Sequence, residues 1–534
     1  MKIIYKVLPA FASLAILSSC NELDTAPMGG TVTETQKQEV VNNNPEMAEA
    51  SVNALPSMTR VYCGVYNNTS VQCDFGFPAL MLNMDTKTAD MSSPNTGYNW
   101  FSYGLTYNDR TSTSRPTRQY WAGMYNMIYS ANAVIKGIDE ETTNSTLRYY
   151  LAQAYGYRAM AYFYLAQMYQ FTYIGNETAP CVPIITPENT DQAATVGLAR
   201  NTVQEVYDFV MNDLNRAVQF LNETGHIVAA TREEKAFITE SNARGLRARV
   251  EMVMNDWQAA ADDAQYVIQN SGAVPYSIDD VSVPSFYTAN DASWIWSINV
   301  NSGDVGNLHC WPAHAVTFYS GGYAGVSVFR KINKALFNQI PESDVRKGWW
   351  LDANGMSINI DNAHQKVLLD YVDDSLSELA YVNVKFNTND NLFSGTSCYL
   401  NDLPLMRIEE MYYILAEAQA MAGNASGLST LVNFVKAYRD PDYNFSSTDA
   451  KQIQDEIWKQ RRIEFWGEGL SYFDLQRLKK DVNRVGGGFP AECVFNIPAD
   501  SPLRLYLIPE AEMESNPAIG ANNPQGPQPT PIAE

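Results

Sequence analysis

The chain has 534 residues, of which 46% are hydrophobic, so it can bury a large core and is not an intrinsically disordered protein. Its 37 basic and 59 acidic side chains give a formal net charge of −22. A surface of that sign repels nucleic acid and anionic lipid headgroups but not a neutral ligand, so no nucleic-acid partner is expected.

The first residues predict an exported lipoprotein. The apolar run 7–17 follows two lysines and is shorter than the about 20 residues of a membrane-spanning helix, which suits a secretory signal. Leu17-Ser18-Ser19-Cys20 is similar to a bacterial lipobox, so residues 1–19 are a predicted signal peptide and Cys20 is the predicted lipidation site. Residues 20–45 are then a polar linker between lipid and protein. Cleavage to a periplasmic protein without lipid is the alternative.

Helical periodicity dominates residues 46–274. Apolar side chains recur every three to four residues in five predicted helices, at 120–138, 147–170, 201–221, 241–254 and 257–269. Large aromatic residues alternate with alanine in paired helices, as in tetratricopeptide repeats, although a strict period of about 34 residues is absent. The predicted fold class is mostly α, a tetratricopeptide-like scaffold of helical hairpins. Length alone also permits several domains.

The helical pattern stops between residues 275 and 400, where glycines mark loops. The segment 293–298 predicts a strand, with Trp294 and Trp296 in the core. Aromatic residues without helical spacing lie among the glycines of this region, and an earlier loop at 95–101 is also aromatic. The chain holds 32 tyrosines and 10 tryptophans, and loops on a rigid scaffold are common places for binding residues. We therefore expect some of these rings to bind ligand rather than fill the core.

Motifs of the common catalytic and metal sites are absent from the sequence. Neither G-x-S-x-G nor a P-loop occurs, and H-E-x-x-H spacing is missing among the four histidines, His226, His309, His314 and His364. No C-x-x-C occurs, which argues against a zinc ribbon. Cys63 and Cys73 are the closest cysteine pair of the body and form either a disulfide or two buried thiols. No metal or cofactor is expected.

The C-terminal region, residues 401–515, returns to helical periodicity, with predicted helices at 405–421 and 427–439. In the stretch 456–475, charged residues recur at helical intervals among large apolar ones. Arg461 with Glu464, or Arg462 with Glu468, can pair across a turn or with a neighbouring helix. We interpret this stretch as a buried ionic brace rather than a ligand site. Residues 516–534 form a proline-containing tail.

The stretch 456–475 resembles the C-terminal signature of the SusD/RagB family, surface lipoproteins that capture nutrients for Bacteroidetes outer membranes. Further landmarks follow the family order: Arg200-Asn201-Thr202-Val203, Arg407-Ile408-Glu409-Glu410 and Ile508-Pro509-Glu510-Ala511-Glu512. One departure is Leu470-Ser471 after Gly469, where the family often has an arginine. The resemblance implies a single SusD-like domain over residues 46–515, with helical hairpins at 46–274, a loop-rich insertion with short strands at 275–400, and C-terminal helices at 401–515.

The resemblance also implies a function without catalysis. Such a protein binds an oligosaccharide and delivers it to a SusC-like TonB-dependent transporter, and it is anchored by lipid to the outer membrane, facing the cell exterior. Capture of a peptide, as by RagB-like proteins, is the alternative. A glycoside hydrolase would need two carboxyl groups about 5–10 Å apart, which the 59 acidic residues neither locate nor exclude.

Ligand contacts in this family come from one early aromatic loop and from the irregular middle region. The resemblance thus implies a shallow site in which rings stack on the ligand and an amide binds a hydroxyl or carbonyl group. The predicted ligand-binding residues are Tyr98, Asn99, Trp100, Trp311, Tyr319 and Tyr323.

Overall fold

The computed structural model of the chain describes residues 34–65, 68–95, 97–304, 306–361, 364, 368, 379–389 and 400–533. The predicted signal peptide and Cys20 lie outside these residues. Within them, no helix is both long enough and apolar enough to cross a membrane.

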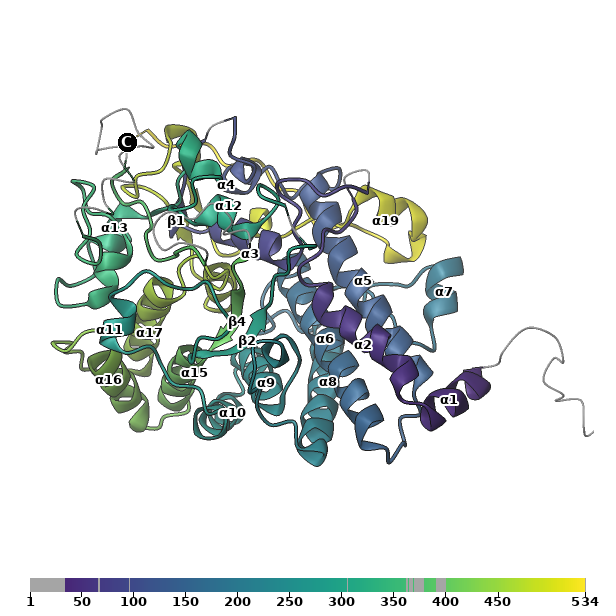
Figure 1. Cartoon of the computed structure of the whole chain (residues 1–534). Coiled ribbons are helices and arrows are strands. Elements are labelled where there is room, and N and C mark those ends of the chain that lie inside the picture. The colour runs from purple at the N-terminus through teal and green to yellow at the C-terminus, as the bar shows by residue number, and fades with distance from the viewer. Residues whose placement is uncertain are drawn as a thin grey trace, which may run out of the picture.

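An array of long helices forms one side of the molecule (Figure 1). Each helix packs on the next along the chain, and α15 packs on α10 and also contacts α17. This arrangement confirms the mostly helical fold class. The helices are α1 (Glu34–Asn43), α2 (Glu46–Ser57), α5 (Arg115–Gly137), α6 (Ser145–Tyr169), α8 (Val203–Thr224), α9 (Glu240–Met254), α10 (Trp257–Asn270), α15 (Ile408–Met421), α16 (Ser426–Tyr438) and α17 (Ala450–Glu464).

Capping residues fix where these helices begin and end. Thr202 and Glu205 form a reciprocal capping box at the start of α8, which satisfies two backbone N–H groups that the helix leaves free. The predicted turn between α9 and α10 is present: Asn255 adopts the left-handed conformation, with φ of 60°, and Asp256 accepts a hydrogen bond from the Ala259 N–H. Helix α1 covers residues 34–43 of the segment assigned to the linker, and Gln38 on it donates to the Lys136 carbonyl of α5.

Short elements and loops cover the other side of the array. The helices are α3 (Phe77–Thr86), α4 (Ser102–Leu105), α7 (Thr190–Thr195), α11 (Ile278–Val281), α12 (Trp311–Ala315), α13 (Lys334–Phe337), α18 (Ser471–Arg477) and α19 (Glu510–Ser515). Short 3-10 turns occur at Glu234–Ala236, Tyr323–Val326, Val345–Trp349, Ala491–Cys493, Pro502–Arg504 and Pro517–Ile519.

The described strands form two-stranded antiparallel sheets. They are β1 (Met91–Ser92) with β3 (Lys331–Ile332), β2 (Trp294–Ile298) with β4 (Leu403–Arg407), and β5 (Val482–Asn483) with β6 (Asn496–Ile497). Strand β2 confirms the predicted strand, and both Trp294 and Trp296 are buried as expected. Residues 405–407, predicted to begin a helix, instead end β4, because this segment pairs with β2 before α15 starts at Ile408.

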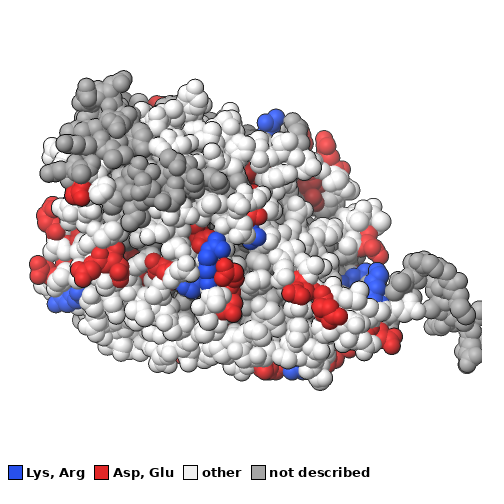
Figure 2. Space-filling view, viewed as in Figure 1, with Lys and Arg blue, Asp and Glu red and all other residues white. Residues whose placement is uncertain are grey.

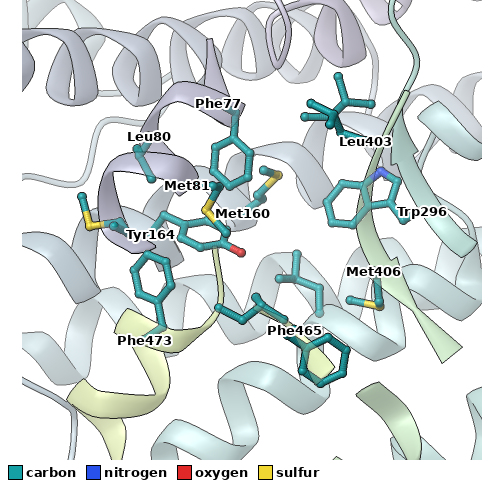
Figure 3. Close-up of a cluster of buried hydrophobic side chains, with 14 of the residues drawn as sticks. Phe77, Leu80, Met81, Met160, Tyr164, Trp296, Leu403, Met406, Phe465 and Phe473 are labelled. Atoms are coloured by element: carbon teal, nitrogen blue, oxygen red, sulfur yellow. The ribbon is translucent and has the colours of Figure 1, made fainter. Parts of the chain in front are cut away.

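The core joins the helical array to the β2–β4 pair (Figure 3). Phe77 and Met81 of α3 lie beside Met160 and Tyr164 of α6, and the Phe77 and Tyr164 rings meet edge to face, with centroids 4.9 Å apart. Trp296, Leu403 and Met406 enter the same cluster from the two strands. One hydrophobic cluster therefore extends from α2 to α18, and a second, smaller cluster lies around Leu475 and Val482.

The helical spacing across residues 457–472 does not correspond to one helix. Helix α17 ends at Glu464, and a turn leads to α18 at Ser471. Gly467 and Gly469 in this turn have φ of 79° and 82°, in the left-handed region that favours glycine. A Cβ atom at these positions would lie 2.7 Å from Phe386 and 2.4 Å from Met81. The glycines break the helix and let two other segments approach closely.

A buried network of charges centres on Glu464, and we call Glu464, Glu468 and their partners the ionic brace. Glu464 accepts from Arg439 at 2.7 Å, Arg407 at 3.1 Å and Arg346 at 3.2 Å, and all four side chains are fully buried. Glu468 pairs with Arg407 at 2.9 Å and with the Lys385 ammonium group at 2.6 Å. Burial lowers the pKa of Lys385 to about 8, although Glu468 opposes this shift.

The ionic brace confirms the interpretation of residues 456–475, but the partners differ from those predicted. Arg461 pairs with Asp474 at 2.7 Å, and Arg462 pairs with Asp90. Neither arginine bonds to Glu464 or Glu468, because their side chains leave α17 toward other segments.

Cys63, Cys181, Cys310 and Cys493 are free thiols, so Cys63 forms no disulfide with Cys73. Of the two predicted alternatives, the structure therefore has thiols and not a disulfide. Cys398 lies outside the described residues.

Replacing Glu464 tests the ionic brace. Glu464→Gln leaves three buried guanidinium groups without their shared carboxylate, so we expect the free energy of unfolding to fall by about 3–5 kcal/mol in urea titrations. The control is Lys451→Gln, which removes an exposed pair with Asp455 at 3.5 Å and should cost no more than about 1 kcal/mol. Equal losses in the two variants would contradict a stabilising role for the brace.

The stability difference between wild type and Glu464→Gln should depend on pH. The surrounding arginines hold the pKa of Glu464 far below its ordinary value despite burial. A carboxyl group with a lowered folded-state pKa adds stability above its unfolded-state pKa, about 4.3, and loses it as the pH falls further. We expect the difference to be constant from pH 7 to 5 and to shrink toward pH 3. A difference that grows on acidification would contradict this assignment.

Candidate ligand-binding site

Three loops meet at the end of the molecule that carries α4 and α12 (Figure 1). Loop 60–75 contacts loop 304–326 through an ion pair between Arg60 and Asp304 at 2.6 Å and a hydrogen bond of 2.9 Å between Ser70 Oγ and His309 Nδ1. The third loop, 95–101, leads into α4 and packs on both through Phe101. The sequence predicted that the early loop and the middle region converge, and the structure brings them together here.

Exposed aromatic side chains gather on the early loop. The exposed fractions are 62% for Tyr98, 41% for Trp100 and 62% for Tyr103. Tyr103, on α4, was not among the predicted site residues, although it follows Trp100 by three positions. We call Tyr98, Trp100 and Tyr103 the exposed ring set. Their accessible faces can stack on the apolar face of a ligand ring.

The middle region contributes support rather than exposed rings. Trp311, Tyr319 and Tyr323 are all buried. Trp311 packs edge to face on Phe386, with centroids 4.8 Å apart, and faces an internal apolar cavity next to Gly467. The Tyr319 hydroxyl donates to the Asn307 carbonyl at 3.0 Å, which closes its own loop. In this structure the faces of these rings are covered by protein.

Tyr323 lies next to Trp100. Burial raises the pKa of Tyr323 to about 12, and the neighbouring Trp100 indole partly offsets this shift. The Tyr323 ring stacks on His314, with centroids 4.6 Å apart, and His314 in turn stacks on Phe75 at 5.6 Å. Burial and the Arg330 cation hold the pKa of His314 well below its ordinary value, so it is a neutral ring in this stack.

Asn99 lies beneath the exposed ring set. Its Nδ2 group donates to the Pro94 carbonyl at 2.8 Å and to Ser93 Oγ at 3.3 Å, and its Oδ1 accepts from the Phe101 N–H at 3.3 Å and from Arg330 at 3.3 Å. Both donors and the acceptor of the amide are thus used inside the protein. Asn99 shapes the loop rather than presenting a free amide.

Arg330 is an unusual partner for Asn99. Its guanidinium group is buried, donates to the His314 carbonyl at 3.0 Å, and has no ion pair with a carboxylate among the described residues. Burial lowers the pKa of Arg330 to about 9. The Asn99 amide and the His314 carbonyl therefore replace part of the water that would otherwise solvate this cation.

The charge of the molecule disfavours an anionic ligand. Acidic side chains are dispersed over the visible face of the molecule, with few basic ones among them (Figure 2). Within the described ranges, no group of three or more histidine, cysteine or acidic side chains is placed to hold a metal ion.

Comparisons with known proteins agree with the fold. The family model described as "Starch-binding associating with outer membrane" matches residues 43–250, and the model "SusD family" matches residues 370–524. "SusD-like protein P2" of Formosa agariphila is 23% identical over 442 residues, which cover 76% of this chain and 80% of that protein.

Solved structures share the fold at low sequence identity. A SusD-like carbohydrate binding protein from Bacteroides vulgatus superposes with a TM-score of 0.73 at 20% identity, covering 89% of this chain and 97% of that one. Surface glycan-binding protein A from Bacteroides thetaiotaomicron, solved in complex with laminarihexaose, has a TM-score of 0.64 at 16% identity and covers 90% and 99%.

Asn99→Ala tests the structural role of this amide. It leaves one Arg330 nitrogen without its acceptor in a buried site, so the free energy of unfolding should fall by about 1–3 kcal/mol. The neighbouring exposed variant Tyr98→Ala should change it by no more than about 0.5 kcal/mol. Chemical denaturation of both variants checks this, and an unchanged stability of Asn99→Ala would refute the role.

Proposed function

We propose a function from the premise that this chain belongs to the SusD family, whose models match residues 43–250 and 370–524. Members of this family bind ligands without catalysis, and the chain is a binding protein rather than an enzyme. Its function is to capture a neutral oligosaccharide at the cell surface and to deliver it, chemically intact, to a partner outer-membrane transporter of the SusC-like, TonB-dependent type.

The exposed ring set is the observation that supports this proposal. Large aromatic side chains are normally buried, so three exposed rings within residues 98–103 indicate a binding surface. A sugar ring has one apolar face and a polar rim, which matches stacking on Tyr98, Trp100 and Tyr103. The net charge of −22 on the chain disfavours anionic ligands.

The supporting residues make the ring set rigid. Tyr323 lies next to Trp100, and the hydrogen bond between Asn99 and Arg330 fixes the loop between Tyr98 and Trp100. A preorganised loop loses little conformational entropy when ligand binds, which favours affinity. Of the six predicted ligand-binding residues, Tyr98 and Trp100 thus act by contact, whereas Asn99, Trp311, Tyr319 and Tyr323 act by support.

The position of the first described helix is consistent with a lipid anchor. Helix α1 lies at the opposite end of α2 and α5 from α4 and α12 (Figure 1). If the preceding residues lead to a lipidated Cys20, the ring set points away from the membrane surface and toward the medium. This orientation suits capture of an external nutrient before transfer to the transporter.

Trp100→Ala tests the proposal. In calorimetry against a panel of neutral oligosaccharides that includes laminarihexaose, we expect the best ligand of the wild type to lose about 2 kcal/mol, or roughly thirtyfold, in affinity. The matched control is Tyr129→Ala, which removes a ring of α5 that is 44% exposed and should leave affinity unchanged.

A peptide pool is measured in parallel. Binding of peptide instead of any oligosaccharide would assign the same surface to peptide capture. Release of shorter sugars from the panel by purified protein would contradict the binding function altogether.

A further inference from the structure

We propose that a hollow beside α13 is a second saccharide-binding site, separate from the exposed ring set. It has a volume of about 410 Å³, within the about 300–1,000 Å³ typical of small-ligand sites. Its lining comes from residues 337–358 and from Tyr381, so it shares no residue with the loop at 95–101. The choice of a saccharide rests on the proposed function, but the site itself does not.

Aromatic residues form the floor of this hollow. Phe337 and Trp350 are buried there, and Tyr381 is half-buried, with one part of its ring accessible. The Phe337 and Tyr381 rings meet edge to face with centroids 5.3 Å apart, which fixes the orientation of Tyr381. A half-buried ring held by a buried one offers a rigid face for stacking.

The backbone of Tyr381 is held in an uncommon conformation. Its φ is 65°, in the left-handed region that a tyrosine rarely adopts. Two hydrogen bonds maintain it: the Tyr381 N–H donates to the Leu351 carbonyl at 3.0 Å, and the Tyr381 carbonyl accepts from the Ile332 N–H at 3.0 Å. Strain of this kind persists where the surroundings enforce it, and it is common at ligand sites. Here it directs the tyrosine ring to the hollow.

The rim of the hollow is polar, and its charged side chains are already engaged within the protein. The Lys347 ammonium group pairs with Glu342 at 2.5 Å and also donates to the Ile340 carbonyl at 2.9 Å. The Asp352 carboxylate accepts from the Asn354 N–H at 2.8 Å and the Met356 N–H at 2.9 Å, which closes the loop around it. One ammonium group and two carboxylates thus give the rim a net negative charge, which disfavours an anionic ligand.

The remaining rim groups suit hydroxyl groups. The exposed amide of Asn354 and the exposed amide of Asn338 each offer a donor and an acceptor at the edge of the hollow. An aromatic face below and amides at the edge match a neutral sugar ring, whose hydroxyls lie around its circumference. The site has room for one or two sugar units of a glycan.

Hydroxyl-radical footprinting tests this proposal on the full-length protein. Tyr381 and the exposed Met356 report on the hollow, Tyr98 and Trp100 report on the ring set, and Tyr129 on α5 is the reference. Laminarihexaose, maltohexaose, cellohexaose and xylohexaose are the probes, each at several millimolar. We expect at least one to lower the oxidation of Tyr381 and Met356 at least twofold, with Tyr129 unchanged.

Variants make the two sites distinguishable. Protection at Tyr381 and Met356 should persist in Trp100→Ala and disappear in Asn354→Ala, an exposed substitution that leaves the floor intact. Protection of Tyr98 and Trp100 alone would overturn the second site and leave the proposed function standing. Protection at the hollow alone would support the second site and overturn the exposed ring set as the binding surface. No protection at either site by any probe would overturn both proposals.

Discussion

The fold depends on a few buried carboxylates. Each of them pairs with cations from distant segments and so holds these segments together. Glu464 at the end of α17 is shared by arginines from the end of β4, from the end of α16 and from the 3-10 turn at Val345–Trp349. A buried charge without partners would cost several kcal/mol, so these segments are stable only when assembled together. The brace therefore couples the loop-rich middle region to the helical array, which supplies the rigid base that a loop-borne site requires.

The ionic brace also explains why the chain reverses where it does. The turn after α17 must bring Glu468 to Arg407 and Lys385 while passing close to Met81 and Phe386. Only glycine fits at 467 and 469, since the backbone is left-handed and a side chain has no room there. The departure from an arginine after Gly469 leaves the brace intact, because its cations come from other segments.

The sequence predicted what depends on local periodicity and missed what depends on tertiary contact. Helices α5, α6, α8, α9 and α10 follow from the spacing of apolar residues, and the turn at Asn255-Asp256 follows from its residue types. Strand β4 was assigned to a helix because its pairing with β2 joins residues more than a hundred positions apart. The partners of Arg461 and Arg462 were missed for the same reason, since Asp90 and Asp474 approach only in the folded chain.

The candidate site shows the same division between local and tertiary information. Glycine-rich sequence around Trp311 and Tyr319 marks loops correctly, but ring exposure depends on what packs against the loop, and there Phe386 and Asn307 cover the rings. Around Tyr98 and Trp100 the outcome is opposite, because the amide of Asn99 is occupied inside and turns its neighbours outward.

The two buried arginines Arg407 and Arg330 differ in their partners. Arg407 is neutralised by three carboxylates, whereas Arg330 has only carbonyl and amide acceptors among the described residues. Its solvation therefore depends on the loop that carries the exposed rings, so the position of that loop is coupled to the burial of a charge.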